Sequence, residues 1–107
     1  MKNRLREINK TSQKRETQAA KDIGGERCPA SGSGVMKGDA RNEKWMVEDK
    51  FTRSSTFLLR LPVVQKARAQ ALKTGRKPVI RVGLPKCELA IISWGDFCDL
   101  ISEGDEE

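Results

Sequence analysis

Three observations predict that this chain of 107 residues folds as one α/β domain with a central sheet flanked by helices. The length suits a single domain with a modest core. Hydrophobic residues make up 36% of the chain and charged residues 34%, as in a soluble globular protein. Helical and strand-like segments follow in the order helix, three strands, helix, two strands, which is the layout of helices packed on a sheet.

The N-terminal segment combines a polar stretch with the first predicted helix. Residues 1–11 are polar and basic, and we expect a flexible arm there. Residues 12–22 are rich in helix-forming types, so they predict a helix that ends before Gly24 and Gly25. The folded domain is therefore expected to cover residues 12–102.

Three short strands are predicted next, at residues 27–30, 35–39 and 45–51. The glycine- and serine-rich stretch 31–34 predicts a turn between the first two. Residues 40–44 are polar and are expected to form the hairpin that leads into the third strand.

The clearest helix is predicted at residues 56–74, where apolar residues recur at helical spacing before Gly75. These apolar residues are Leu58, Leu59, Val63, Ala67, Ala71 and Leu72. Both tryptophans, Trp45 and Trp94, are expected in the core. The remaining predicted elements are strands at 78–82 and 88–93, a short helix at 96–101 and an acidic tail at 103–107.

Charge is distributed unevenly along the chain, whose net charge is +6. Residues 52–87 contain nine Lys and Arg and no acidic residue, whereas residues 88–107 contain seven acidic and no basic residues. The basic middle favours a polyanionic partner, most simply nucleic acid, over a merely solvated surface. The residues expected to contact DNA are Arg53, Lys66, Arg68, Lys73, Arg76 and Lys77.

Two features of composition exclude whole classes of function. Histidine is absent, so a serine or cysteine hydrolase with a histidine base is excluded, and hydrolysis must use carboxylates, lysine or a metal-activated water. The chain has three scattered cysteines, Cys28, Cys87 and Cys98, and no CxxC pair. We expect the thiols to be reduced and mostly buried, as in a cytoplasmic protein, and we expect no zinc site. No apolar run approaches the roughly 18 residues of a membrane span.

One pattern of charged residues predicts catalytic chemistry. Asp39 precedes Glu48 by nine positions, and Lys50 follows Glu48 at the i+2 position of a predicted strand. Residues i and i+2 of a strand point to the same face, so Glu48 and Lys50 project together. Two carboxylates can bind Mg²⁺ through oxygen ligands, and a lysine beside them can orient water and stabilise a phosphorane-like transition state. The pattern therefore predicts metal-assisted phosphodiester hydrolysis.

This pattern resembles the PD-(D/E)xK nuclease superfamily, and within it the small archaeal and phage Holliday junction resolvases. Those enzymes have a helix with a glutamate, an R-x-x-x-S-G turn, an aspartate and then E-x-K. The matching residues in this chain are Glu16, Arg27, Ser31, Gly32, Asp39, Glu48 and Lys50. The resemblance covers roughly residues 12–101 and departs from the family at Gly38, where the family has proline.

The resemblance implies a restriction-endonuclease-like fold with a central mixed sheet, and a role for several further residues. Glu16 would be an additional catalytic and metal-site carboxylate, with Glu26 as the competing candidate. Ser31 or Ser33 would contact phosphate, although such a stretch is often only a linker, and Arg27 would contact the DNA backbone.

The resemblance also implies Mg²⁺ or Mn²⁺ as cofactor, a homodimer, and four-way DNA junctions as substrate. Restriction and nicking enzymes share the same catalytic pattern, so cleavage of duplex DNA is the first alternative. A DNA-binding protein without catalysis is the second.

Overall fold

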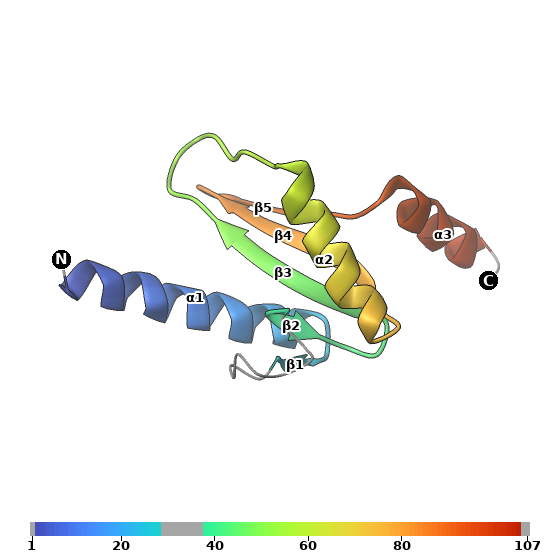
Figure 1. Ribbon diagram of the computed structural model, residues 1–107, viewed down its shortest axis with the longest axis horizontal. Coiled ribbons are helices and arrows are strands. Elements are labelled where there is room, and N and C mark those ends of the chain that lie inside the picture. Colours follow the sequence, from blue (N-terminus) through green and yellow to red (C-terminus); the bar gives the residue numbers. More distant parts are fainter. Residues whose placement is uncertain (1, 29–37, 106–107) are drawn as a thin grey trace.

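The computed structural model of the chain describes residues 2–28 and 38–105 (Figure 1). The elements are α1 (Lys2–Asp22), β1 (Glu26–Arg27), β2 (Ala40–Arg41), β3 (Trp45–Phe51), α2 (Leu61–Lys73), β4 (Lys77–Leu84), β5 (Cys87–Ile91) and α3 (Trp94–Asp105). In this described part of the chain, no helix is both long and apolar enough to cross a lipid bilayer.

The five strands form one mixed sheet in the order β1-β2-β3-β4-β5. β3 and β4 are parallel and are joined through α2, whereas the other neighbouring strands are antiparallel. This arrangement confirms the predicted α/β class with a mixed sheet flanked by helices.

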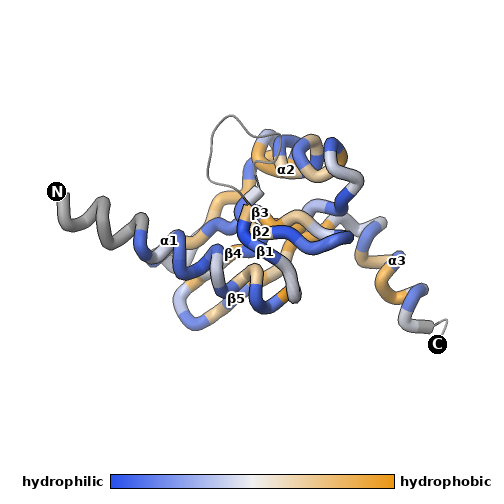
Figure 2. Tube along the Cα trace, turned by 90° about the horizontal axis from the view of Figure 1, so that it is seen from below, coloured by the Kyte–Doolittle hydropathy of each residue, from blue (hydrophilic) through white to orange (hydrophobic). Residues whose placement is uncertain are grey.

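Alternation along the strands builds a small core on each face of the sheet. One core lies beneath α1 and is formed by Ala19, Ala20, Ala40 and Val47, with Ile23 and Val79 packed against it. The other lies beneath α2 and is formed by Ala67, Ile80 and Val82, with Phe57, Val63, Val64, Leu84 and Ile91 packed against it. Because adjacent strand residues point to opposite faces, α1 and α2 cover opposite sides of the sheet (Figures 1 and 2).

The first helix is longer than predicted. α1 begins at Lys2, so the segment for which the sequence predicts a flexible arm is helical. Its lysine, arginine and glutamate side chains are good helix formers, and polarity alone therefore did not indicate an arm.

The first two strands also differ from the prediction. Most of the strand predicted at 35–39 lies outside the described residues, and β2 occupies the first two positions of the predicted hairpin. The side-chain oxygen of Asn42 accepts hydrogen bonds from the backbone N–H groups of Lys44 and Trp45, which tightens the turn and leaves Ala40–Arg41 free to pair with β3.

The second helix starts at Leu61, five residues later than predicted. Pro62 lies in its first turn, where its missing N–H needs no helical partner, whereas a helix from residue 56 would require that N–H to donate to the carbonyl of Leu58. Leu58 and Leu59 consequently lie ahead of the helix and are exposed, and Leu72 within it is also exposed.

Several residues expected in the core lie at the surface. Trp94 is 78% exposed, although the sequence predicts it to be buried. Cys28 is buried as expected, but Cys87 and Cys98 are exposed. Cys87 begins β5 at the edge of the sheet, and Trp94 and Cys98 belong to α3, none of whose residues joins either core cluster.

Candidate active site

β3 carries Glu48 and Lys50 on one face and Asp49 on the other. Asp49 points toward α1, since its carboxylate is bound by Arg15 of that helix. Alternation therefore directs Glu48 and Lys50 to the face that α2 covers. Lys50 Nζ lies 3.5 Å from Glu48 Oε1, and both side chains are partly exposed. The predicted pairing of these two side chains is present.

Asp39 lies just ahead of β2 and is fixed by backbone hydrogen bonds on both sides. Its N–H donates to the carbonyl of Val47 at 2.9 Å, and its own carbonyl accepts from the N–H of Cys28 at 3.1 Å. Its side-chain Oδ2 accepts a 2.6 Å hydrogen bond from the backbone N–H of Asp49. Asp39 is thus held against the strand that carries Glu48 and Lys50.

Burial and neighbouring negative charge raise the pKa of Asp39 to about 7. Burial has the largest effect; the hydrogen bond from Asp49 opposes it, and the charges of Glu48 and Glu16 add to it. The carboxylates of Glu48 on β3 and of Glu16 on α1 are thus near enough to Asp39 for their charges to raise its pKa.

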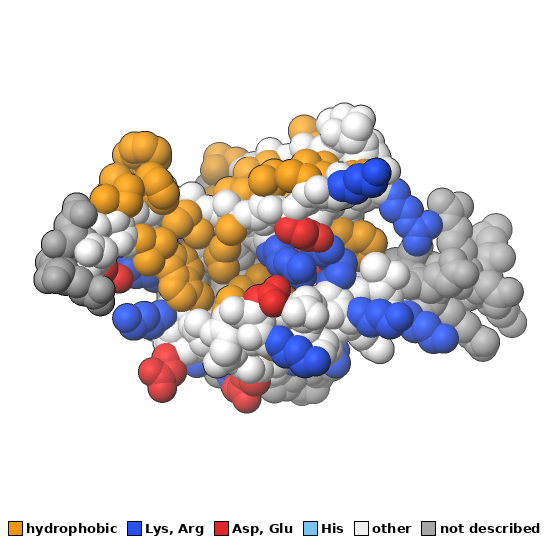
Figure 3. Space-filling view, turned by 180° about the vertical axis from the view of Figure 1, so that it is seen from behind, with side chains coloured by type: hydrophobic (Ala, Val, Ile, Leu, Met, Phe, Trp, Pro, Cys, Tyr) orange, Lys and Arg blue, Asp and Glu red, His pale blue; other side chains and the backbone are white. Residues whose placement is uncertain are grey.

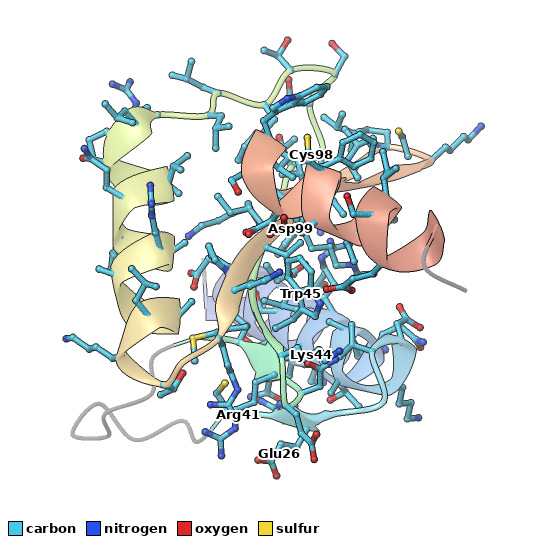
Figure 4. All side chains as sticks on the ribbon, turned by 90° about the vertical axis from the view of Figure 1, so that its right-hand side faces the viewer. Glu26, Arg41, Lys44, Trp45, Cys98 and Asp99 are labelled. Atoms are coloured by element: carbon cyan, nitrogen blue, oxygen red, sulfur yellow. The ribbon has the colours of Figure 1, made fainter. Side chains whose placement is uncertain are left out.

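Glu16, rather than its competitor Glu26, belongs to this group of carboxylates. Glu16 Oε2 accepts a hydrogen bond at 3.0 Å from Arg27, which the sequence had proposed as a DNA contact. Glu26 is exposed and forms an ion pair at 2.8 Å with Arg41 of β2; Figure 4 labels both residues. The charge of Glu16 therefore acts on Asp39, and the choice of Glu16 over Glu26 as a catalytic carboxylate stays a prediction.

A buried charge network that the sequence did not reveal ties α1 to this site. Arg15 donates to both oxygens of Asp49, at 2.8 and 2.9 Å, and to both oxygens of Glu88, at 2.7 and 3.0 Å. Arg81 lies 3.5 Å from Asp49, whose side chain is only 3% exposed. Glu88 and Asp49 raise the pKa of Arg15, and Arg15 in turn lowers the pKa of Glu88. The network sets α1, and hence Glu16, against the strand that holds Asp39.

Gly38 has little room for any side chain. A Cβ atom there would lie 2.5 Å from Cγ of Met46, which is buried. The enzymes that the sequence resembles have proline at this position, and here the side chain of Met46 fills the space that a proline ring would need.

The predicted DNA contacts divide into two groups. Lys66, Arg68 and Lys73 are exposed on α2, and Arg53 is exposed just after β3. These four are exposed to solvent, with Lys66 and Lys73 on one flank of α2 and Arg68 on the other. Ser31 and Ser33 lie outside the described residues.

Arg76 and Lys77 instead make contacts within the domain. Arg76 Nε donates to the carbonyl of Asn42 at 2.6 Å, and Lys77 lies 3.6 Å from Asp99 and 5.9 Å from the centre of the Trp45 ring. Lys77 pairs with the start of β3, whereas Lys50 lies five residues further along it. At about 3.3 Å per residue, this separates Lys77 from Lys50 by roughly 16 Å.

Among the residues described, no three His, Cys, Asp or Glu side chains are arranged so that they could hold a metal ion as they stand. Comparison of the chain with protein-family models, curated proteins and solved structures finds no match.

Proposed function

We propose that this chain is a divalent-metal-dependent DNA endonuclease in which Asp39, Glu48 and Lys50 are catalytic residues and Glu16 assists. The observation that carries the proposal is that the half-buried Asp39 lies within the electrostatic influence of Glu48 and Glu16, while Lys50 lies 3.5 Å from Glu48. These side chains come from α1, from the residue ahead of β2, and from β3.

The charge balance at this place favours a bound cation. Grouping carboxylates away from water costs free energy unless positive charge compensates them. Glu16 has Arg27 and Glu48 has Lys50, but Asp39 receives only a backbone hydrogen bond. Mg²⁺ retains several waters and requires only one or two protein carboxylates. Asp39 and Glu48 therefore fit Mg²⁺ or Mn²⁺, with Glu16 as a further oxygen donor.

The residues present suit hydrolysis of a phosphodiester. A divalent cation, when bound, stabilises charge on the phosphate and activates a water molecule. The ammonium group of Lys50 lies on the same face and can stabilise the negative charge that develops on the phosphate. Asp39 is held rigidly by Asp49 N–H, so its carboxylate is oriented before substrate binds.

DNA is the substrate that the charge pattern favours. The exposed cations of α2 and Arg53 are available to contact phosphates. By the resemblance described above, we infer a restriction-endonuclease-like fold and a homodimer acting in the cytoplasm on four-way junctions.

The test is cleavage of a labelled four-way junction, beside the matching duplex, with Mg²⁺ and with EDTA. We expect paired nicks in the junction that EDTA abolishes. Asp39→Asn and Lys50→Ala should each reduce the rate at least about 100-fold, the usual effect of losing one group that stabilises a transition state.

Matched controls come from the turn ahead of β3. Glu43→Gln and Lys44→Ala remove the same kinds of charge from exposed positions, and both should cut at the wild-type rate. Wild-type cleavage by Asp39→Asn would refute the site. Preference for duplex would keep the nuclease and refute the junction substrate, and salt-sensitive binding without cleavage in any divalent metal would indicate a non-catalytic DNA-binding protein.

A further inference from the structure

α3 stands apart from the body of the domain. Figure 1 shows it beyond the end of the sheet, connected through the short segment after β5. None of its residues belongs to either core cluster. The ion pair between Lys77 and Asp99, with 38% and 64% of the side chains exposed, reaches it from β4. Pairs this exposed contribute about 0–1 kcal/mol, so the chain itself holds α3 weakly.

One side of α3 is apolar and exposed. Trp94, Phe97, Leu100 and Ile101 are 78%, 42%, 42% and 51% exposed. Their spacing of three, four and seven residues places them along one side of the helix. Figure 3 shows hydrophobic side chains gathered at this end of the molecule. A 12-residue helix is marginal in water without tertiary packing, so this face requires cover.

The acidic residues of α3 lie on its other side. Asp96, Asp99 and Glu103 are spaced by three, four and seven residues, on the side of the helix opposite Trp94 and Ile101. A phosphate backbone or an anionic membrane would be repelled by this helix and by the acidic residues that follow it. The cover is therefore a protein surface.

A second copy of this chain meets these requirements. Two apolar faces can pack across a two-fold axis while the acidic sides turn away from each other, which avoids repulsion between like charges. All 21 basic residues and 8 of the 15 acidic residues lie before residue 88. The body of a second copy therefore also offers positive charge to the acidic side of α3. Trp94 can bury most of the about 150–250 Å² of an aromatic side chain, and Phe97, Leu100 and Ile101 can bury the roughly half of their surface that is exposed, which together supplies part of the roughly 800 Å² per partner in a standard interface.

We propose that the apolar face of α3 is the homodimer interface, in which Trp94 and Ile101 of one copy pack against the same face of another. This interface says where the two chains of the proposed homodimer meet. It rests on the proposed function only for the expectation that the chain is a dimer. The exposed face itself is independent of any catalytic residue.

The experiment measures molar mass by light scattering after size exclusion, at about 100 μM and without divalent metal. Wild type should have twice the chain's 12.0 kDa. The double variant Trp94→Gln/Ile101→Gln should have the mass of one chain, because both exposed anchors are lost. Glu103→Gln is the matched control on the polar side of the helix and should remain dimeric. Circular dichroism and a thermal melt verify that each variant is folded.

A second measurement does not depend on substitution of the apolar face. Cys98 lies four residues after Trp94 and so borders that face, whereas Cys28 is buried. In a Cys87→Ser background, a short bis-maleimide should link two chains, and Cys98→Ser should abolish the link.

A monomeric wild type, a folded double variant that remains dimeric, or no link through Cys98 would each overturn the interface. These outcomes are separate from those of the cleavage test. A monomer that cuts DNA would refute the proposed interface and support the nuclease. A dimer through α3 that does not cut DNA would support the interface and refute the nuclease.

Discussion

Replacing Arg15 with alanine removes the cation that neutralises a buried carboxylate beside the site. Asp49 has a side chain only 3% exposed and would keep Arg81 at 3.5 Å as its remaining ionic partner. Removing one partner of a buried ion pair costs about 3–5 kcal/mol. The bond to Glu88, which is half exposed, adds about 0–1 kcal/mol. Since small domains are stable by about 5–15 kcal/mol, we expect Arg15→Ala to lose a large share of the free energy of unfolding.

Urea unfolding followed by circular dichroism measures this loss. With an m value of about 1–3 kcal/mol/M, the unfolding midpoint should fall by more than about 1 M. Arg27→Ala is the matched control, because its pair with Glu16 is 41% and 24% exposed and should contribute within about 1 kcal/mol. A loss below about 1 kcal/mol for Arg15→Ala would refute the reasoning, since the network would then be no stronger than a surface pair.

Three further predictions follow from particular contacts. Gly83→Ala places a Cβ 2.6 Å from the Arg15 guanidinium, so it should lower the free energy of unfolding, measured in urea, by about 1–3 kcal/mol. The same substitution should lower it by less in an Arg15→Ala background. Asp39→Asn should stabilise the metal-free protein at pH 8 and not at pH 3. Because folding raises the pKa of Asp39 from 3.8 to about 7, the stability contributed by its protonated form is complete below 3.8 and is lost as pH rises through 7; melts at both pH values check this. Lys66→Ala and Arg68→Ala should each lower the slope of log Kobs for DNA binding against log salt by about 0.9, measured by anisotropy.

The strand that carries the catalytic pair was the most predictable part of the fold. In 45–51, the β-forming residues Trp45, Val47 and Phe51 fall on one face of a strand, and β3 has the predicted bounds. The start of α2 was wrong because apolar spacing alone extended the helix back to residue 56, whereas the restriction at Pro62 placed its beginning at Leu61. Local backbone rules outweighed periodicity there.

The position of α3 could not be predicted from its own sequence. Trp94 was expected in the core ahead of a predicted helix at 96–101, whereas it begins α3, whose apolar residues have the spacing of a helix face. Periodicity states that a face needs cover, but it does not state whether this chain or another provides it. The error in Trp94 is therefore the same fact that supports an interface between chains.

The Arg15 network was equally hidden, because its members lie 34 and 73 residues apart in sequence. One signal was available: alternation in β3 places Asp49 on the face of Val47 and Phe51, where a carboxylate needs a basic partner. No rule of spacing indicates that the partner is Arg15.

Two adjacent carboxylates of β3 illustrate how the same residue type acquires different uses. Asp49 is buried and lies against two arginines, so its charge is compensated within the chain and it serves to hold α1 in place. Glu48 lies on the other face with Lys50 at 3.5 Å, and its charge acts on Asp39, which among the described residues receives only a backbone hydrogen bond on its carboxylate. A charge that the fold balances stabilises the fold, whereas one that it leaves unbalanced is available to a cation from solution. On this physical ground Glu48, and not its neighbour in sequence, is the residue to test as a metal ligand.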